Sequence, residues 1–461
     1  MKFRSLLLLS FVFIFNSSFS QTKLLGLWKG YILSNGDSIN IELVFSKEKN
    51  QYTGIMNIPA QNAMDLPIKN ISLQKEKIHF TFGNSIMIFD GTMLKDSVVG
   101  DFKQSMYAGN FYLKKVGTIK EISKKLPYKE EEVSIVNNDI VLGGSLTIPK
   151  GKGPFPAVIL ITGSGAQNRN ESTYGFHIFK VIADYLTRNG VAVLRLDDRG
   201  IGKSTGDFSK ATTLDFASDI EKAFEYLKLN KNINPSKIGL LGHSEGGLVA
   251  PIVANKYSDV AFVISMAGPA ITGEDILLLQ TRLIMEAENI SDSLINKAVY
   301  TNSLLYYAVK TGRDWDKVDS ILALQVKSEL DSTPLNKKAL IKDEAKYINL
   351  RVKNIEKNVL SDWFKFFLSY DPKPALSNLN CPALLLYGGK DLQVPATENI
   401  KSAELAFADK QNKTIKLYPT ANHLFQNANT GSVSEYAKLD PKFVDGFLED
   451  ILKFITNQKN Q

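Results

Sequence analysis

The stretch Ile238–Gly247, IGLLGHSEGG, decides the fold of this chain. A short aliphatic run ends in Gly-His-Ser-Glu-Gly, and a helical pattern, GLVAPIVANKY, follows directly. A Gly-x-Ser-x-Gly core between a strand and a helix is typical of a sharp turn that presents a serine at its tip. Glycine at 242 and 246 is expected because a side chain at either place would collide with a neighbouring element. A bare match arises by chance in many chains, so the strand-turn-helix setting carries the interpretation of Ser244 as a nucleophile.

A serine hydroxyl needs a histidine base that a carboxylate orients. The chain has 4 histidines, and only His423 lies downstream of the serine, as the order Ser, acid, His requires. It follows the strand-like KTIKLYP in TANHLF. Asp391, in LLLYGGKDLQVP, comes just after an apolar strand and two glycines, a placement that Asp371 and Asp409 lack. Ser244, Asp391 and His423 are therefore the predicted catalytic residues.

Two backbone amides are needed to stabilise the oxyanion that forms when the serine attacks. One is expected at Glu245, at the start of the helix after the serine. The other is expected in ITGSGAQNRNE, at Ser164, with Gly165 as the alternative. This glycine-containing loop lacks the Gly-Lys-Ser/Thr and Gly-x-Gly-x-x-Gly patterns of phosphate-binding loops.

Hydrophobic patterning divides the chain into two parts. Residues 21–116 read as short alternating runs separated by Gly, Asn, Asp and Pro, which predicts a small all-β meander or barrel. A charged joint over 117–132 follows. From 133 to 461, continuous apolar strands alternate with helices, which predicts an α/β fold with a doubly wound, mostly parallel sheet. Residues 269–374 hold only amphipathic helical stretches, so we expect a helical lid inserted above the serine.

The first residues of the chain predict an exported protein. Residues 1–20 combine Lys2 and Arg4 with a short apolar run and small residues at 18 and 20, which predicts a signal peptide rather than a membrane span.

The net charge of the chain is mild. Its formal value is +7, and it falls to +5 when Lys2 and Arg4 are removed with the expected signal peptide. Charges of both signs are interleaved, so a nucleic-acid partner is not expected. The chain has 1 cysteine, so no intrachain disulfide can form.

Together, GHSEGG, GGKDLQVP, NHLF, TGSGAQNRNE and LRLDDRGIGKSTG make residues 127–461 resemble the α/β-hydrolase superfamily. Within it the chain is similar to exported bacterial carboxylesterases close to the serine-aminopeptidase and prolyl-oligopeptidase-like branches. Many such relatives carry histidine where this chain has Thr162, so the oxyanion loop departs from their pattern.

The resemblance implies a carboxylesterase-type serine hydrolase that cleaves small-molecule esters through an acyl-enzyme, with no metal and no organic cofactor. A peptidase or aminopeptidase with the same three residues is the first alternative, and Glu274, Asp275, Glu286 and Glu288 could then capture a substrate ammonium. A non-catalytic exported binding protein with a degenerate hydrolase domain is the second. We expect a periplasmic or extracellular location, and the sequence leaves the oligomeric state open.

Overall fold

The computed structural model describes residues 23–34, 37–48, 51–58, 63–82, 87–104, 107–117, 126–331, 338, 341, 343–408 and 410–457. The predicted signal peptide, residues 1–20, lies outside them. The chain divides into two compact units, Met1–Gln61 with Leu66–Ile122, and Asn62–Asp65 with Ser123–Gln461. Each unit is described by itself below.

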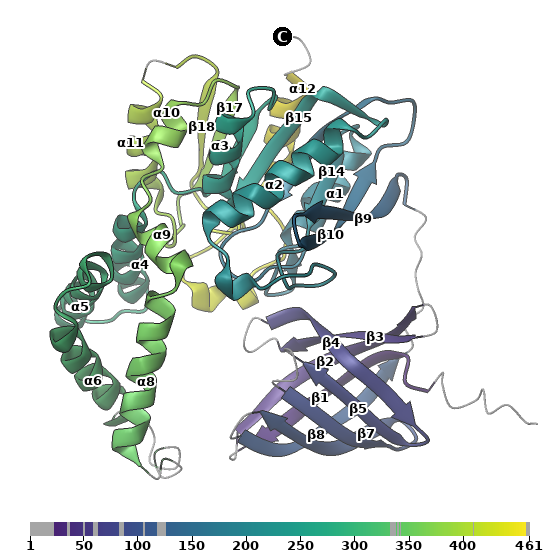
Figure 1. Ribbon diagram of the computed structural model, residues 1–461, viewed down its shortest axis with the longest axis vertical. Helices are drawn as coiled ribbons and strands as arrows, with labels where there is room; N and C mark the ends of the chain where they lie inside the picture. Colours follow the sequence, from purple (N-terminus) through teal and green to yellow (C-terminus); the bar gives the residue numbers. More distant parts are fainter. Residues whose placement is uncertain are drawn as a thin grey trace, which may run out of the picture. The chain divides into compact units, whose positions relative to one another are not determined.

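The first unit is a closed antiparallel barrel in which each strand pairs with the next and β8 returns to β1 (Figure 1). Its strands are β1 Gly26–Ser34, β2 Asp37–Glu48, β3 Gln51–Ile58, β4 Ala63–Gln74, β5 Lys77–Phe82, β6 Met87–Met93, β7 Ser97–Gln104 and β8 Tyr107–Gly117. Closure leaves no unpaired sheet edge, which protects a small β unit from edge-to-edge association.

Aromatic side chains fill the barrel. Phe80 stacks on Phe89 with ring centroids 4.7 Å apart, and the edge of Phe111 meets Phe89 at 5.3 Å. Trp28 and Phe45 are also buried, at 1% exposure each. Small barrels of this strand number have an interior just wide enough for side chains. This interior is therefore a packed core.

The second unit is built on an eight-stranded sheet in the order β18-β17-β16-β15-β11-β14-β10-β9. Neighbours from β18 to β14 are parallel, and β10 is antiparallel to both β14 and β9. The strands are β9 Lys129–Asn137, β10 Ile140–Ile148, β11 Phe155–Ile161, β14 Ala192–Leu196, β15 Ile233–His243, β16 Val263–Met266, β17 Ala383–Gly388 and β18 Lys413–Tyr418. A two-stranded hairpin, β12 Ser172–Thr173 with β13 Phe176–His177, follows β11.

Part of the predicted joint over 117–132 is a strand rather than a linker. β9 begins at Lys129 and pairs along its whole length with β10. Its charged start is tolerated because Glu130 pairs with the buried guanidinium of Arg195, with 2.7 Å between the charged atoms. Residues 118–125 of the joint lie outside the described residues.

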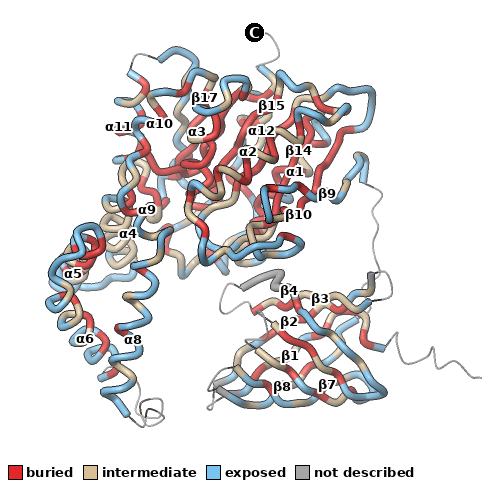
Figure 2. Tube along the Cα trace, in the orientation of Figure 1, coloured by how far each residue is buried: buried red, intermediate tan, exposed pale blue. Residues whose placement is uncertain are grey.

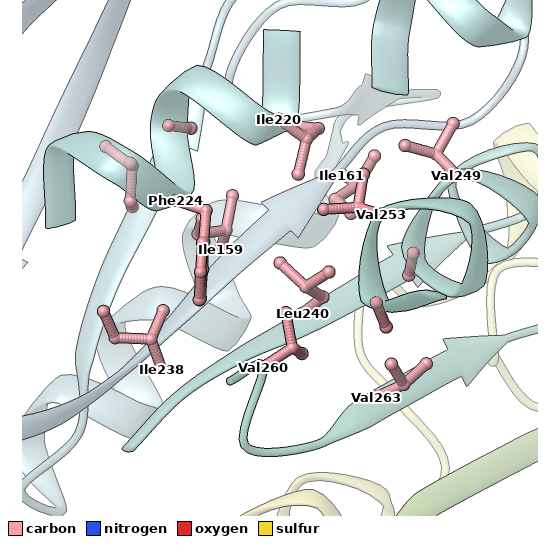
Figure 3. Close-up of a cluster of buried hydrophobic side chains, with 14 of the residues drawn as sticks. Ile159, Ile161, Ile220, Phe224, Ile238, Leu240, Val249, Val253, Val260 and Val263 are labelled. Atoms are coloured by element: carbon pink, nitrogen blue, oxygen red, sulfur yellow. The ribbon is translucent and has the colours of Figure 1, made fainter. Parts of the chain in front are cut away.

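Helices cover both faces of the sheet, and each face has its own core. The covering helices are α1 Ile178–Arg188, α2 Thr213–Lys228, α3 Gly246–Lys256, α10 Lys373–Ser377, α11 Ala396–Ala406 and α12 Phe447–Asn457. α1 and α12 pack on one face, and α2, α3, α10 and α11 on the other. Figure 3 shows Phe224 of α2 and Val253 of α3 lying against Ile159 and Leu240 of the sheet. The central strands are buried on both sides (Figure 2), which explains their continuous apolar sequences.

A helical insertion separates β16 from β17. Its helices are α4 Gly273–Ala287, α5 Asp292–Thr311, α6 Trp315–Asp331, α8 Glu344–Val359 and α9 Asp362–Ser369. They pack on one another around a small core that includes Leu305, Val309, Leu322 and Val352. The predicted fold class is confirmed: a small all-β unit precedes a mostly parallel, doubly wound sheet with a helical insertion.

The aromatic core of the barrel generates a stability prediction. Phe80→Ala should lower the free energy of unfolding of the barrel by about 3–5 kcal/mol, because it removes ring contacts and leaves a cavity. Urea unfolding followed by tryptophan fluorescence measures this, since Trp28 is buried in the same core. The matched control is Val99→Ala on β7, where the side chain is 40% exposed, and it should change stability by less than about 0.5 kcal/mol. Equal effects of the two substitutions would contradict the packed-core interpretation.

Candidate active site

Ser244 lies at a tight turn between β15 and α3. Its φ is +52°, a left-handed conformation that non-glycine residues rarely adopt. Its own N–H donates to the carbonyl oxygen of Met266, with 2.8 Å between the two atoms. A Cβ at Gly242 would come within 1.9 Å of the Gly246 carbonyl oxygen, and one at Gly246 within 2.2 Å of the Ile161 carbonyl oxygen. Glycine is therefore required at both flanking positions, as the sequence predicts.

Ser244 and His423 line the same cavity, which has a volume of about 370 Å³. The carboxyl ends of the parallel strands supply much of its wall, at the edge where ligands bind in open α/β sheets. Helices α4 and α9 of the insertion supply a further part of the wall. The wall residues that these two helices contribute are Ile276, Leu277, Gln280, Trp363 and Phe367.

Asp391 and His423 are brought together from two loops. His423 Nδ1 lies 2.8 Å from Asp391 Oδ2, and both residues are buried, at 5% and 3% exposure. The other oxygen of Asp391 accepts hydrogen bonds from the backbone N–H groups of Gln393 and Val394, at 2.8 and 2.9 Å. These two bonds hold the carboxylate in one orientation, so that it can hold the imidazole ring.

The competing residues lie elsewhere. Asp371 accepts a hydrogen bond from the backbone of Lys373, and Asp409 is outside the described residues. His79 pairs with Asp90 on the barrel at 2.7 Å, and His177 Nδ1 lies 2.8 Å from the Ser172 hydroxyl in the hairpin after β11. Neither of these histidines lines the cavity.

The loop after β11 also reaches the cavity, with Gly163 and Ser164 in its wall. The N–H of Gly163 already donates to Glu171 Oε1 at 2.8 Å. The loop is tied down by Asp198, which accepts from the Thr162 hydroxyl and from the Gln167 N–H, both at 2.7 Å. Thr162 stands where many proteins of the resembled families carry histidine, and in this chain it anchors the loop to Asp198.

Glu245 has a role in the structure that the sequence did not reveal. Its side chain is 2% exposed and accepts hydrogen bonds from the Thr213 hydroxyl at 2.6 Å and the Trp363 indole N–H at 2.8 Å. The residue after the serine is thereby joined to α9 of the insertion. Burial raises the pKa of Glu245 above its ordinary value, and the hydrogen bonds from Thr213, Trp363 and Ser164 only partly oppose this.

The four acidic residues of the insertion that could have captured a substrate ammonium face other partners. Glu274 pairs with Lys310 at 2.5 Å, and Glu286 with Arg282 at 3.7 Å. Asp275 accepts from the Thr272 hydroxyl at 2.6 Å, and Glu288 from the Ser434 hydroxyl at 2.8 Å. Within the part of the chain that the structure describes, Glu171 is the only carboxylate in the cavity wall.

Among the residues that the structure describes, no group of three or more His, Cys, Asp or Glu side chains is placed to hold a metal ion. No helix in the described ranges combines the length and apolar character that a bilayer span needs.

The chain is similar to several known proteins. Residues 175–428, more than half of the chain, match the family described as serine aminopeptidase, S33. Esterase EstD of Thermotoga maritima is 27% identical over 374 residues, covering 78% of this chain and 77% of that protein. Among solved structures, an esterase of Pyrococcus furiosus aligns with a TM-score of 0.45 at 15% identity, covering 73% of this chain and 93% of that one. An α/β hydrolase, GrgF from Penicillium, aligns with a TM-score of 0.44 at 17% identity, covering 72% and 99%.

The raised pKa of Glu245 predicts a pH-dependent stability difference. A carboxyl whose pKa is higher in the folded state stabilises the fold below its unfolded pKa, and this contribution is lost as the pH rises through the folded pKa. Glutamine cannot ionise, so it does not lose this contribution. The free energy of unfolding of Glu245→Gln, relative to that of the wild type, should therefore increase as the pH rises from 4.5, the ordinary pKa of glutamate, to the raised pKa. Urea unfolding of both chains at about pH 4 and about pH 9 measures the difference.

Asp215 is the matched control for Glu245. Burial acts to raise its pKa, but hydrogen bonds with Thr212 and Arg199 and the charge of Arg199 lower it overall. Asp215→Asn should therefore lose stability relative to the wild type only as the pH rises from the lowered pKa to the ordinary value of 3.8, and this difference should stay nearly constant over the range in which Glu245→Gln gains. A Glu245→Gln difference that is flat in pH, or that has the sign of the control, would contradict the prediction.

Proposed function

The chain belongs to the serine aminopeptidase S33 family, within the α/β-hydrolase superfamily that its motifs resemble, and on this premise we propose that it is a serine hydrolase that cleaves carboxylic esters. One observation carries the proposal. Ser244, held at positive φ, shares a cavity with His423, whose Nδ1 lies 2.8 Å from Asp391. These are the residue types that acyl transfer needs, in the required chain order.

The proposed mechanism proceeds through an acyl-enzyme. Because Nδ1 of His423 faces Asp391, Nε2 is the ring nitrogen that takes the proton of Ser244 as its oxygen attacks the ester carbonyl. His423 then returns that proton to the leaving alcohol. Water, activated by the same nitrogen, releases the acid. Asp391 keeps the imidazole in the correct tautomer and stabilises its charged form.

The backbone amides of Glu245 and Ser164 are proposed to form the oxyanion hole. Glu245 stands at the start of α3, where N–H groups lack partners within the helix. The N–H of Gly163 is engaged by Glu171, which leaves the next amide, that of Ser164, as the donor from this loop. Gly165 remains the alternative.

The cavity favours a neutral ester over the amino-terminal residue of a peptide. An aminopeptidase binds the substrate ammonium, which requires a carboxylate free to receive it. Glu274, Asp275, Glu286 and Glu288 face other partners outside the cavity wall. In the wall, Oε1 of Glu171 is occupied by Gly163 and His243, and its Oε2, which has no hydrogen-bond partner among the described residues, is buried and not exposed to a ligand. The wall residues from the insertion are mainly apolar, which suits an uncharged acyl group.

The remaining parts of the chain receive supporting roles in this proposal. We assign the insertion between β16 and β17 the role of a lid that selects the acyl or alcohol group. We assign no chemistry to the barrel, because its aromatic interior is packed and His79, its only histidine, pairs with Asp90. The signal peptide expected at residues 1–20 would deliver the mature chain to the periplasm or the medium.

Ser244→Ala tests the nucleophile. Turnover of a short acyl ester should fall by at least about 10⁴-fold, since the covalent step is lost. The circular dichroism spectrum should be unchanged, because alanine fits wherever serine does. Aminoacyl amides are assayed alongside the esters, and the wild type should prefer the esters. A folded Ser244→Ala chain with near-normal turnover would contradict the proposed mechanism, and a preference for the amides would favour the aminopeptidase alternative.

Leu277 of α4 tests the lid. Leu277→Ala removes apolar side-chain volume from the cavity wall, so kcat/KM for longer acyl chains should rise relative to short ones by about 10-fold. The matched control is Leu324→Ala on α6 of the same insertion, where the side chain is 67% exposed. Steady-state kinetics over a series of acyl lengths makes the measurement. A preference that shifts equally in both variants would count against a selective lid.

A further inference from the structure

His243 precedes the nucleophile, and both of its ring nitrogens are engaged. Nδ1 lies 2.8 Å from Oε1 of Glu171, and Nε2 lies 3.0 Å from the backbone carbonyl oxygen of His423. His243 is 3% exposed and Glu171 2% exposed, so water does not screen the pair. Neither side chain has a part in the mechanism proposed above.

The partners of the pair determine how many protons it holds. A carbonyl oxygen can only accept, so Nε2 of His243 carries a proton. Oε1 of Glu171 faces Nδ1 of His243 and also accepts the Gly163 N–H at 2.8 Å. An ionised carboxylate can only accept, so with Glu171 in that form the second proton of the pair lies on Nδ1. The pair is then an imidazolium beside a carboxylate, joined by a charge-assisted hydrogen bond.

The charged groups around His243 favour this state. Burial by itself lowers the pKa of His243, but the charge and hydrogen bond of Glu171, the His423 carbonyl and the charge of Asp391 together raise it above the ordinary value of 6.5. The ring of His423 also faces it, with centroids 4.9 Å apart and planes at 42°.

The pair joins three separate parts of the proposed catalytic machinery. Glu171 holds Gly163, one residue before the proposed oxyanion donor Ser164. His243 is adjacent to Ser244 at the turn after β15. The other side of its ring holds the backbone of His423, the proposed base.

We propose that Glu171 and His243 are positioning residues, a buried imidazolium–carboxylate pair that keeps the His423 backbone and the Gly163–Ser164 amides in place around Ser244. The inference rests on the proposed function and adds to it, since neither residue touches the reacting atoms. A displacement of a catalytic group by about 1 Å can cost on the order of 100-fold in rate. Losing the charge pair should therefore act on kcat more than on KM.

The kinetic test uses Glu171→Gln, His243→Gln and the double variant in the full chain. Each should lower kcat by about 10- to 100-fold with KM changed less than about 3-fold, and the double variant should match the worse single variant because the residues act as a unit. The wild type should lose activity at alkaline pH as His243 gives up its proton, and the variants should lack this limb. The matched control is His79→Gln, which breaks an exposed histidine–carboxylate pair in the barrel and should leave kcat unchanged.

The protonation state can be read independently of catalysis. The chain has 4 histidines, so ¹⁵N-histidine labelling gives a small set of ring signals, and the signal lost in His243→Gln identifies His243. In the wild type both ring nitrogens of His243 should remain protonated at pH 7, and in Glu171→Gln the ring should be neutral there. A neutral His243 in the wild type, or kcat within about 2-fold of wild type in both single variants, would overturn the proposal.

The two proposals fail in different ways. If Ser244→Ala retains turnover, the proposed mechanism falls, while the ring signals still decide whether the buried pair is charged. If Ser244→Ala is inactive and the Glu171 and His243 variants keep the wild-type kcat and pH profile, the mechanism stands and the positioning role is wrong.

Discussion

The arrangement of the site depends on the close approach of α3 to the ends of β11 and β15. At this point the first residue of the helix lies against the Ile161 carbonyl oxygen, so close that Gly246 cannot carry a side chain. The turn fits only if Ser244 adopts positive φ, which costs about 1–3 kcal/mol for a non-glycine residue. Cores on both faces of the sheet hold the strand and the helix in place, and the turn cannot relax without disturbing them. The strain is therefore maintained at the position where a side chain must project into the cavity.

Two buried carboxylates, Asp197 and Asp391, and the half-buried Asp198 hold the loops at this edge of the sheet. Asp197 and Asp198 follow β14 and bind the loop after β11, Asp197 through Arg169 and Asp198 through Thr162 and Gln167. Asp391 follows β17 and binds its own loop as well as His423. Backbone N–H groups in such loops lack the partners that strands and helices supply, and a carboxylate oxygen can satisfy two of them. The acids thus fasten these irregular loops to one another through hydrogen bonds at the edge of the sheet.

The helical insertion has two kinds of apolar residue. Leu305, Val309 and Val318 pack into its own core, whereas Ile276 and Phe367 face the cavity. The apolar residues of the insertion therefore form both its own core and part of the cavity wall. The hydrogen bond between Trp363 and Glu245 places a side chain of the insertion next to the proposed oxyanion hole. A change in the position of α9 would therefore disturb Glu245, the residue after the proposed nucleophile.

The sequence by itself determined the features that depend on residues close together along the chain. The strand-turn-helix at Ser244, the alternation of β9 to β18 with helices and the candidate histidine could all be predicted, because local spacing and a small histidine count constrain them. The tertiary structure alone decided which buried polar groups meet. Glu171 reaches His243 across 72 positions and Trp363 reaches Glu245 across 118, and such pairs leave no periodic signal in the sequence. The start of β9 was missed for the same reason: its run of charges reads as a linker until Arg195, 65 positions away, is seen to neutralise Glu130. Burial of a charge is favourable only beside its partner, and only the folded chain brings the two together.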